Sequence, residues 1–410
     1  MAPAPSPETP HVTAPVSERI LALDALRGVA VIGIVGMNVL AFALPGPAYY
    51  NPLAYGGESA ADYWVWLTSF VLIEDKFRTL FAMLFGVGCL ILLERGGPNG
   101  QKRPWRAHYA RMIVLFSIGI VHAVLLANND VLRAYALAGL ALPLLAGLSA
   151  QGLVSVALGL LMVHLALGMT ALGPPLVAFH VKHFGSDALL WAERQFGHDA
   201  AAITALLEQG REGLGERAVR RTLGIPGQLR NLVASLPLNL AAIALGMGLW
   251  RSGMLKGEWR VFRLQRIGGF AALVALPGLL LLAVWLVAEG FPAALVGPVA
   301  LVISAPFDML LAVSYAAMAM AFLSKDSGLT RRLAMVGRLS LSNYLMTSVI
   351  LSAIFASWGF GLFGEVTRWQ AFALGLVPVA GMLLWSPLWV ARLGQGPFER
   401  LWRGAARALS

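Results

Sequence analysis

The chain has 410 residues, of which 58% are hydrophobic and only 13% are charged, and its mean hydropathy is +0.72. About one-quarter of the residues of a soluble domain are charged, so this composition excludes an ordinary soluble domain and predicts a polytopic membrane protein. The formal net charge of +10 would indicate nucleic acid in a soluble protein. Here the basic residues cluster between apolar runs, as in cytoplasmic loops, and we expect no nucleic-acid partner. The lone Cys89 cannot form an intrachain disulfide.

The first apolar stretch, residues 20–44, is long enough to cross a bilayer as a helix. It follows residues 1–18, whose Pro-, Ala- and Ser-rich composition predicts a disordered cytoplasmic tail. Asp24 and Arg27 are three residues apart, so we expect a structural ion pair on one helical face. Asn38 lies eleven residues beyond Arg27, on nearly the same face. A polar residue at that depth is costly, which predicts that Asn38 faces a cavity or the bundle interior.

The next apolar stretch, residues 62–93, is interrupted by the charged sequence EDKFR at 74–78. Each half is too short to span a bilayer comfortably. Two interpretations are open: one interrupted crossing with the charges packed inside the protein, or two spans joined by a surface turn. The single crossing is favoured because it places the basic loops 94–111, 251–266 and 323–338 on one side of the membrane.

Eight further crossings are expected, which gives an all-α bundle of about ten crossings with both termini in the cytoplasm. They are 110–127, 131–148, 151–173, 229–250, 267–288, 295–322, 339–358 and 369–391. Residues 174–228 are polar with balanced charge and predict one or two amphipathic helices outside the bilayer core, on the side away from the basic loops. The expected organisation is therefore an N-terminal transmembrane half (19–173), this extramembrane segment, a C-terminal half (229–391) and a basic cytoplasmic tail (392–410).

Polar residues near the junction of the crossings 110–127 and 131–148 are the best candidates for chemistry. His122 is a titratable group in an apolar helix, and a neutral imidazole there is suited to act as a general base. The alternative is a core histidine that bonds a neighbouring carbonyl. Asp130 and Arg133 are typical of a helix start, and His164 and Asp308 are expected to be isolated structural residues. No Cys or His spacing predicts a metal site, and no P-loop or dinucleotide motif occurs.

Several long motifs resemble the YeiB-type family of bacterial inner-membrane proteins. They are LDALRGVAVIGIVGMN, KFRTLFAMLFGVG and GIVHAVLLANNDVLRAYALAGL, and the later GRLSLSNYLMTSVI and GPFERLWR resemble its C-terminal region, domain of unknown function 418. The resemblance covers nearly the whole chain from residue 19. More distantly, the chain is similar to transmembrane acyltransferases of acyltransferase family 3 and of the heparan-glucosaminide N-acetyltransferase group. That likeness implies a multi-pass inner-membrane protein that moves an acyl group from cytosolic acyl-CoA or acetyl-CoA to a hydroxyl or amine on the periplasmic side.

The resemblance also implies roles for particular residues. Acyltransferase family 3 has an Arg, ten residues and a catalytic His in its first helix, whereas this chain has Asn38 at the position of the His. Asparagine cannot act as a base but can stabilise an oxyanion. The base would then be His122, oriented by Asp130 or Tyr135. Four basic residues would bind the phosphates of CoA: Arg27, Lys76, Arg78 and Arg338. The alternative for each is that it only sets the orientation of the chain in the membrane or forms an internal ion pair.

Two other functions remain open at this stage. In a transporter or channel, the charges Glu74, Asp75 and Lys76 would line an ion path. In a non-catalytic scaffold or sensor, residues 174–228 would form a docking surface. In each case the chain would be surrounded by the lipid bilayer. If it is an acyltransferase, the acceptor would be a periplasmic glycan or small molecule. The sequence does not predict the oligomeric state.

Overall fold

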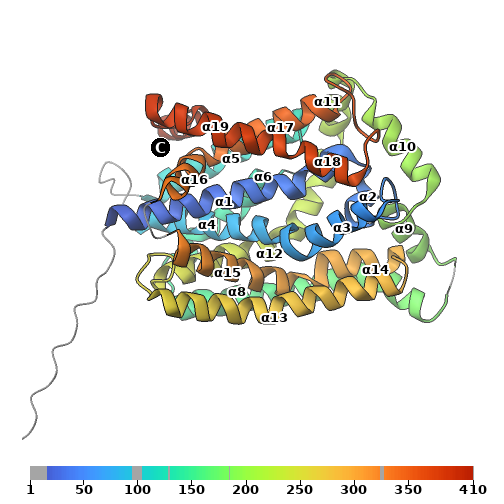
Figure 1. The fold of residues 1–410 in the computed structure, drawn as a ribbon, viewed down its shortest axis with the longest axis horizontal. Coiled ribbons are helices and arrows are strands. Elements are labelled where there is room, and N and C mark those ends of the chain that lie inside the picture. Colours follow the sequence, from blue (N-terminus) through green and yellow to red (C-terminus); the bar gives the residue numbers. More distant parts are fainter. Residues whose placement is uncertain (1–15, 95–103, 128–129, 184, 324–326, 410) are drawn as a thin grey trace, which may run out of the picture.

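The computed structural model describes residues 16–94, 104–127, 130–183, 185–323 and 327–409, and every regular element in these ranges is helical (Figure 1). Most of the long helices run along one axis of the molecule, side by side. Eight helical stretches in the described ranges are long and apolar enough to cross a membrane, and a ninth forms if one bent pair is counted together. The predicted all-α polytopic membrane bundle is confirmed.

The helices fall into long elements and shorter elements that join or flank them. The long ones are α1 (Val16–Ala43), α4 (Lys76–Glu94), α5 (Pro104–Leu125), α8 (Ala150–His180), α12 (Ile225–Arg251), α13 (Val261–Ala288), α15 (Ala305–Phe322), α17 (Ser340–Phe355) and α19 (Leu376–Leu393). The shorter ones are α2 (Gly46–Tyr50), α3 (Ala60–Thr68), α6 (Val131–Gly139), α7 (Leu142–Leu145), α9 (Asp187–Phe196), α10 (Ala200–Gly210), α11 (Leu214–Leu223), α14 (Ala293–Pro298), α16 (Gly328–Arg338), α18 (Arg368–Leu374) and α20 (Pro397–Leu409). Two π-helical turns, η1 (Ser69–Ile73) and η2 (Val299–Ile303), precede α4 and α15.

The interrupted stretch at 62–93 forms one bent crossing, as predicted, from α3, η1 and α4. The bend is at Asp75, whose φ is +59°. Lys76, which follows, is buried and forms an ion pair of 2.7 Å with Asp308 of α15. Its Nζ also donates to the Phe70 carbonyl, because the break in the helix leaves backbone groups that need partners in an apolar interior. The prediction that Asp308 is isolated is therefore wrong.

The predicted crossing at 131–148 is made by two short helices, α6 and α7. At one end, Arg133 of α6 bonds Gln228 at the start of α12. At the other end, Arg251 at the end of α12 donates to the carbonyls of Ala146 and Leu148. Residues 131–148 therefore extend from one end of α12 to the other. They do so with fewer residues than the roughly 20 that a lipid-exposed helix needs to cross a bilayer. α6 is buried inside the protein, whereas Leu140 and Leu144, in and just before α7, are exposed.

The basic end of the bundle, where α1 begins and α20 lies, is more helical than expected. The predicted loop 323–338 contains α16, and the predicted tail 392–410 contains α20, which packs on α5 through the bond from Trp402 Nε1 to the Arg111 carbonyl. α16 packs so closely on α1 that a Cβ at Gly337 would lie 1.9 Å from the Asp24 carbonyl oxygen. These two helices were not predicted because short amphipathic helices rich in arginine look like polar loops in a hydropathy pattern.

The opposite end carries α9, α10 and α11, as Figure 1 shows. α8 continues to His180 through Pro174 and Pro175, so the predicted extramembrane segment begins with the last turns of this helix. It then forms three helices where one or two were predicted. At the N-terminus, α1 begins at Val16, so residues 16–18, which were predicted to belong to the tail, are part of this helix. Residues 1–15 of the predicted tail and 95–103 of the basic loop lie outside the described residues.

Candidate active site

A cavity of about 530 Å³, which we call the α11 chamber, lies at the end of the bundle that carries α9–α11. α1, α4, α6, α11, α12 and α17 all contribute side chains to its wall. The polar and charged members of the wall are Asn38, Arg78, Asp130, Arg133, Gln209, Arg217, Arg220, Arg221, Gln228, Asn231, Ser235, Asn239 and Ser352. The chamber therefore collects residues that are far apart in the sequence.

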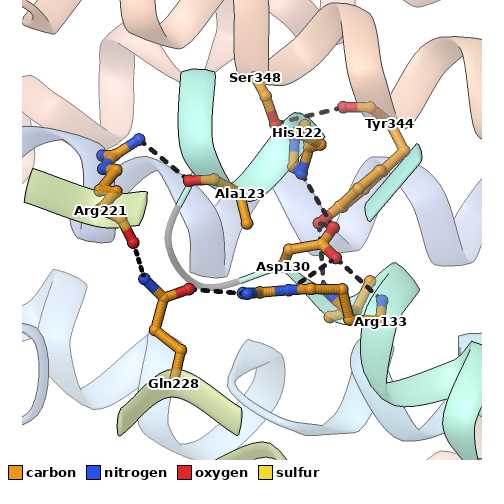
Figure 2. Close-up of polar contacts among 9 residues, drawn as sticks. His122, Ala123, Asp130, Arg133, Arg221, Gln228, Tyr344 and Ser348 are labelled. Atoms are coloured by element: carbon orange, nitrogen blue, oxygen red, sulfur yellow. Dashed lines mark hydrogen bonds and ion pairs between the residues drawn. The ribbon is translucent and has the colours of Figure 1, made fainter. Parts of the chain in front are cut away.

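His122 and Asp130 form a buried pair beside this chamber (Figure 2). Nδ1 of His122 lies 2.9 Å from Oδ1 of Asp130, and both side chains are almost fully shielded from solvent. Asp130 is also the N-cap of α6, where its Oδ2 accepts from the Arg133 backbone N–H at 2.9 Å. The hydroxyl of Tyr344 on α17 donates to the same carboxylate at 3.4 Å. Helix capping, which the sequence predicts for Asp130, thus fixes the carboxylate that holds the imidazole.

A polar network continues from Asp130 toward α11 and α12 (Figure 2). The Arg133 guanidinium lies 3.5 Å from the Asp130 carboxylate and donates to Gln228 Oε1 at 2.7 Å. Gln228 Nε2 in turn donates to the Arg221 carbonyl at 3.0 Å. The side chain of Arg221 reaches back to the Ala123 carbonyl, one residue after His122, at 3.4 Å. The network therefore ties the imidazole-bearing end of α5 to the wall of the chamber.

The free nitrogen of the His122 ring determines what the pair is able to do. An ionised Asp130 accepts a hydrogen bond, so the neutral ring carries its hydrogen on Nδ1 and its lone pair on Nε2. Nε2 is buried and has no hydrogen-bond partner among the described residues. A histidine oriented by a carboxylate in this way is suited to accept a proton at Nε2. His122 itself does not line the chamber, whose nearest wall is Asp130.

The other two residues predicted to be catalytic lie in different surroundings. Asn38 on α1 lines the α11 chamber, in agreement with the expectation that it faces a cavity. Tyr135 on α6 is buried, and its hydroxyl donates to the Arg78 carbonyl at 2.8 Å. Its ring stacks on Phe85 at 5.5 Å between centroids. Asp130 hydrogen-bonds His122 and the Tyr344 ring lies against it, whereas no hydrogen bond or ring contact joins Tyr135 to His122 among the described residues.

A second cavity, of about 680 Å³, lies at the basic end between α1, α4, α5, α16 and α20, and we call it the α20 chamber. Arg27 and Arg338, two of the four predicted phosphate ligands, line it. Arg27 also forms the expected ion pair with Asp24, at 2.8 Å. The sequence prediction missed three further cations in this wall, which are Arg111, Lys256 and Arg403. Their only signal in the sequence is that they belong to basic segments between apolar runs.

The remaining two predicted phosphate ligands are not in the α20 chamber. Lys76 is engaged with Asp308 in the interior, and Arg78 lines the α11 chamber, where it pairs with Asp75 at 2.9 Å. Arg78 and Phe81 are one helical turn apart on α4, yet they line different chambers. Side chains of α4 therefore form part of the partition between the chambers, and the ring of Tyr135 packs on two of them, Phe81 and Phe85.

Comparison with known proteins places the chain among relatives of similar length. It is 32% identical over 401 residues to the uncharacterized protein YeiB of Escherichia coli (strain K12), which covers 94% of this chain and 96% of that protein. This chain belongs to the YeiB family. It is also 26% identical over 412 residues to the uncharacterized protein YxaH of Bacillus subtilis (strain 168), with 95% and 94% covered. Residues 249–408 match the family described as "Protein of unknown function (DUF418)", and no solved structure matches.

In this member of the YeiB family, the DUF418 region contains the bent helix pair and the residue that stabilises its bend. α16 and α17 meet at 79°. Glu399 of α20 accepts from the backbone N–H groups of Leu341 (2.8 Å) and Ser342 (3.1 Å), and from the Ser342 hydroxyl. A carboxylate at the first turn of a helix satisfies its free N–H groups and complements the helix dipole. The motif GPFERLWR thus supplies the cap of the helix that carries Tyr344.

Proposed function

We propose that this protein is an inner-membrane acyltransferase that moves an acyl group from acyl-CoA, bound at the basic end, to a hydroxyl or amine acceptor at the opposite, periplasmic end. The observation that carries the proposal is the buried His122–Asp130 pair, whose Nε2 has no partner among the described residues. The pair lies beside a polar chamber, and the wall of a second, basic chamber begins one helical turn farther along α4. A base beside the acceptor chamber, with a second chamber for the acyl donor, suits transfer between two sides of a membrane.

In the proposed reaction, Nε2 of His122 takes the proton of the acceptor hydroxyl or amine as its oxygen or nitrogen attacks the thioester carbonyl. Asp130 holds the ring and stabilises the imidazolium that forms, and Tyr344 holds the carboxylate in place. The amide of Asn38 donates to the developing oxyanion. The carbon–sulfur bond then breaks, and the proton passes from His122 to the leaving thiolate. Hydrogen bonds to the reacting atoms often tighten only when the substrate is bound, so the His122 ring is not required to line the empty chamber.

The α20 chamber fits a cosubstrate with several phosphates. Its described wall has five Arg and Lys side chains, Arg27, Arg111, Lys256, Arg338 and Arg403, against the carboxylates of Asp24, Glu258 and Glu399. Guanidinium groups bind phosphate oxygens in a bidentate manner, and one carboxylate, Glu399, is committed to capping α17. The excess of positive charge would hold the nucleotide phosphates, and the thioester arm would extend toward the partition.

A transfer assay with two matched histidine variants tests the proposal. The protein is reconstituted in proteoliposomes with radiolabelled acetyl-CoA on one side and a periplasmic extract as the pool of acceptors on the other. We expect transfer of label by the wild type and by His164→Ala, because His164 of α8 bonds the Leu301 carbonyl, at 3.0 Å, and does not line the α11 chamber. We expect His122→Ala to insert and fold but to transfer no label. Transfer by His122→Ala at the wild-type rate would remove this residue from the mechanism.

A transporter is the second candidate, and the buried pair of Lys76 and Asp308 favours it. Ionisable residues at this depth in a membrane protein often mark an ion path. If the protein transports a proton or ion through this pair, the double variant Lys76→Met/Asp308→Leu should abolish uptake into proteoliposomes. Retention of acyl transfer by the same variant, without any uptake by the wild type, would exclude the transporter.

A further inference from the structure

Helix α11 presents three arginines on one face. Arg217, Arg220 and Arg221 are spaced i, i+3 and i+4, so their side chains project from neighbouring positions on the helix surface, and all three line the α11 chamber. Like charges at this spacing destabilise a helix. The positive-inside rule does not account for them, because they lie at the end of the bundle opposite the basic loops. A reason specific to the chamber is needed.

The ion pairs of these arginines are incomplete. Arg220 pairs with Glu212 at 2.8 Å. Arg217 donates to the carbonyls of Gly210 (3.0 Å) and Glu212 (3.3 Å), and Arg221 donates to the carbonyl of Ala123. In the part of the chain that the structure describes, no carboxylate lies within ion-pairing distance of Arg217 or Arg221. Each of these two guanidinium groups has five N–H donors, so both keep donors for a ligand.

Burial makes this charge costly. Arg217 is 9% exposed, and burial lowers the pKa of its guanidinium. Burial, together with repulsion from Arg217 and Arg220, lowers the pKa of Arg221 to about 10, so this side chain is still charged at neutral pH. The described wall of the chamber has five arginines, Arg78 and Arg133 included, and one carboxylate, that of Asp130. Asp75 and Glu212, outside the wall, pair with Arg78 and Arg220, so the imbalance lies at Arg217 and Arg221. A bound anion would relieve this imbalance.

We propose that the α11 chamber binds an anionic molecule through Arg217 and Arg221, and that this molecule is the acceptor, with a phosphate or carboxylate on a hydroxyl-bearing body. The planar guanidinium fork matches both anions. Amide and hydroxyl groups in the same wall suit sugar-like hydroxyls, and they belong to Asn38, Gln228, Asn231, Ser235 and Asn239. A volume of about 530 Å³ is in the range of small-ligand sites. The assignment as acceptor rests on the proposed acyl transfer, whereas the anion site does not.

Binding without an acyl donor tests the anion site separately from catalysis. The purified full-length protein is titrated calorimetrically with glucose 6-phosphate and, as the uncharged match, with glucose. We expect saturable binding of the phosphate ester only. Arg221→Gln keeps a polar side chain but loses the charge, and it should weaken binding roughly tenfold or more. Arg230→Gln, an exposed arginine at the start of α12 that does not line the chamber, should bind as the wild type does.

Equal affinity in Arg221→Gln and the wild type, or equal binding of glucose and glucose 6-phosphate, would overturn the anion site while leaving the His122 assay unaffected. Anion binding without transfer in that assay would overturn the acyl-transfer proposal and leave the site. A second titration in nanodiscs that contain phosphatidylglycerol distinguishes the source of the anion. Competition with glucose 6-phosphate indicates a lipid headgroup, and unchanged binding indicates a water-soluble acceptor.

Discussion

Removal of one partner of the Lys76–Asp308 pair should destabilise the protein far more than removal of both. The two side chains are 1% and 4% exposed, and their N–O distance is 2.7 Å. Loss of one partner from a buried pair leaves an uncompensated charge and costs about 3–5 kcal/mol. In Lys76→Met the bond to the Phe70 carbonyl is lost too, which adds about 1 kcal/mol. Lys76→Met with Asp308→Leu removes both charges, so only the carbonyl cost of about 1 kcal/mol should remain.

The single cysteine of the chain offers the assay. Cys89 is 7% exposed and lines the α20 chamber, so a thiol-reactive fluorogenic dye should label it slowly in the folded protein and much faster as the detergent-solubilised protein unfolds on heating. We expect each single variant to unfold well below the wild type and the double variant to unfold close to it. The matched control is Glu212→Ala with Arg220→Ala, a partly exposed pair that is worth about 0–1 kcal/mol. Additive effects of Lys76→Met and Asp308→Leu would refute the reasoning, since residues in contact should couple.

Three further predictions concern the site and the packing around it. Asp130→Asn disturbs the tautomer and orientation of His122, so the transfer rate should fall by roughly 10²–10⁴-fold. A rate within twofold of the wild type would contradict a role of the His122–Asp130 pair in transfer. Glu399→Ala leaves two backbone N–H groups of α17 without an acceptor and should cost about 2–4 kcal/mol in the Cys89 assay, and an unchanged unfolding temperature would contradict the cap. Gly337→Ala should separate α1 from α16 and lower the unfolding temperature. Gly404→Ala, where a Cβ would meet nothing within 4 Å, should not lower it. Equal unfolding temperatures of the two variants would argue against the close contact of α1 and α16.

The membrane class, most of the long helices and the interrupted crossing were predictable because each leaves a local signal. Apolar runs of bilayer length and the side preference of basic residues are read directly from composition. The cap formed by Asp130 is also local, since it depends on the three residues that follow. The helices α16 and α20 were missed, because their stability comes from packing on α1 and α5 and not from a hydropathy pattern of their own.

The candidate site was only partly predictable. His122 and Asp130 are close in the sequence, and a candidate pair between them follows from the short turn that separates their helices. The division of the four basic candidates between two chambers and the interior does not follow from the sequence, because all four lie in or beside apolar helices. Arg217 and Arg221 were counted only as part of a balanced polar segment, since charge balance along the chain hides an excess that gathers on one face.

The amino-acid sequence by itself determined that this protein crosses a membrane many times, which family it resembles, and where costly polar residues occur along its helices. Those properties depend on transfer of side chains from water to lipid, which each segment experiences alone. Only the tertiary structure decided which of the polar residues meet, that Lys76 neutralises Asp308, and that arginines from α11 face the same chamber as Asn38. Electrostatic interactions act over a few ångströms, so they depend on how helices distant in sequence pack, and not on their order in the chain.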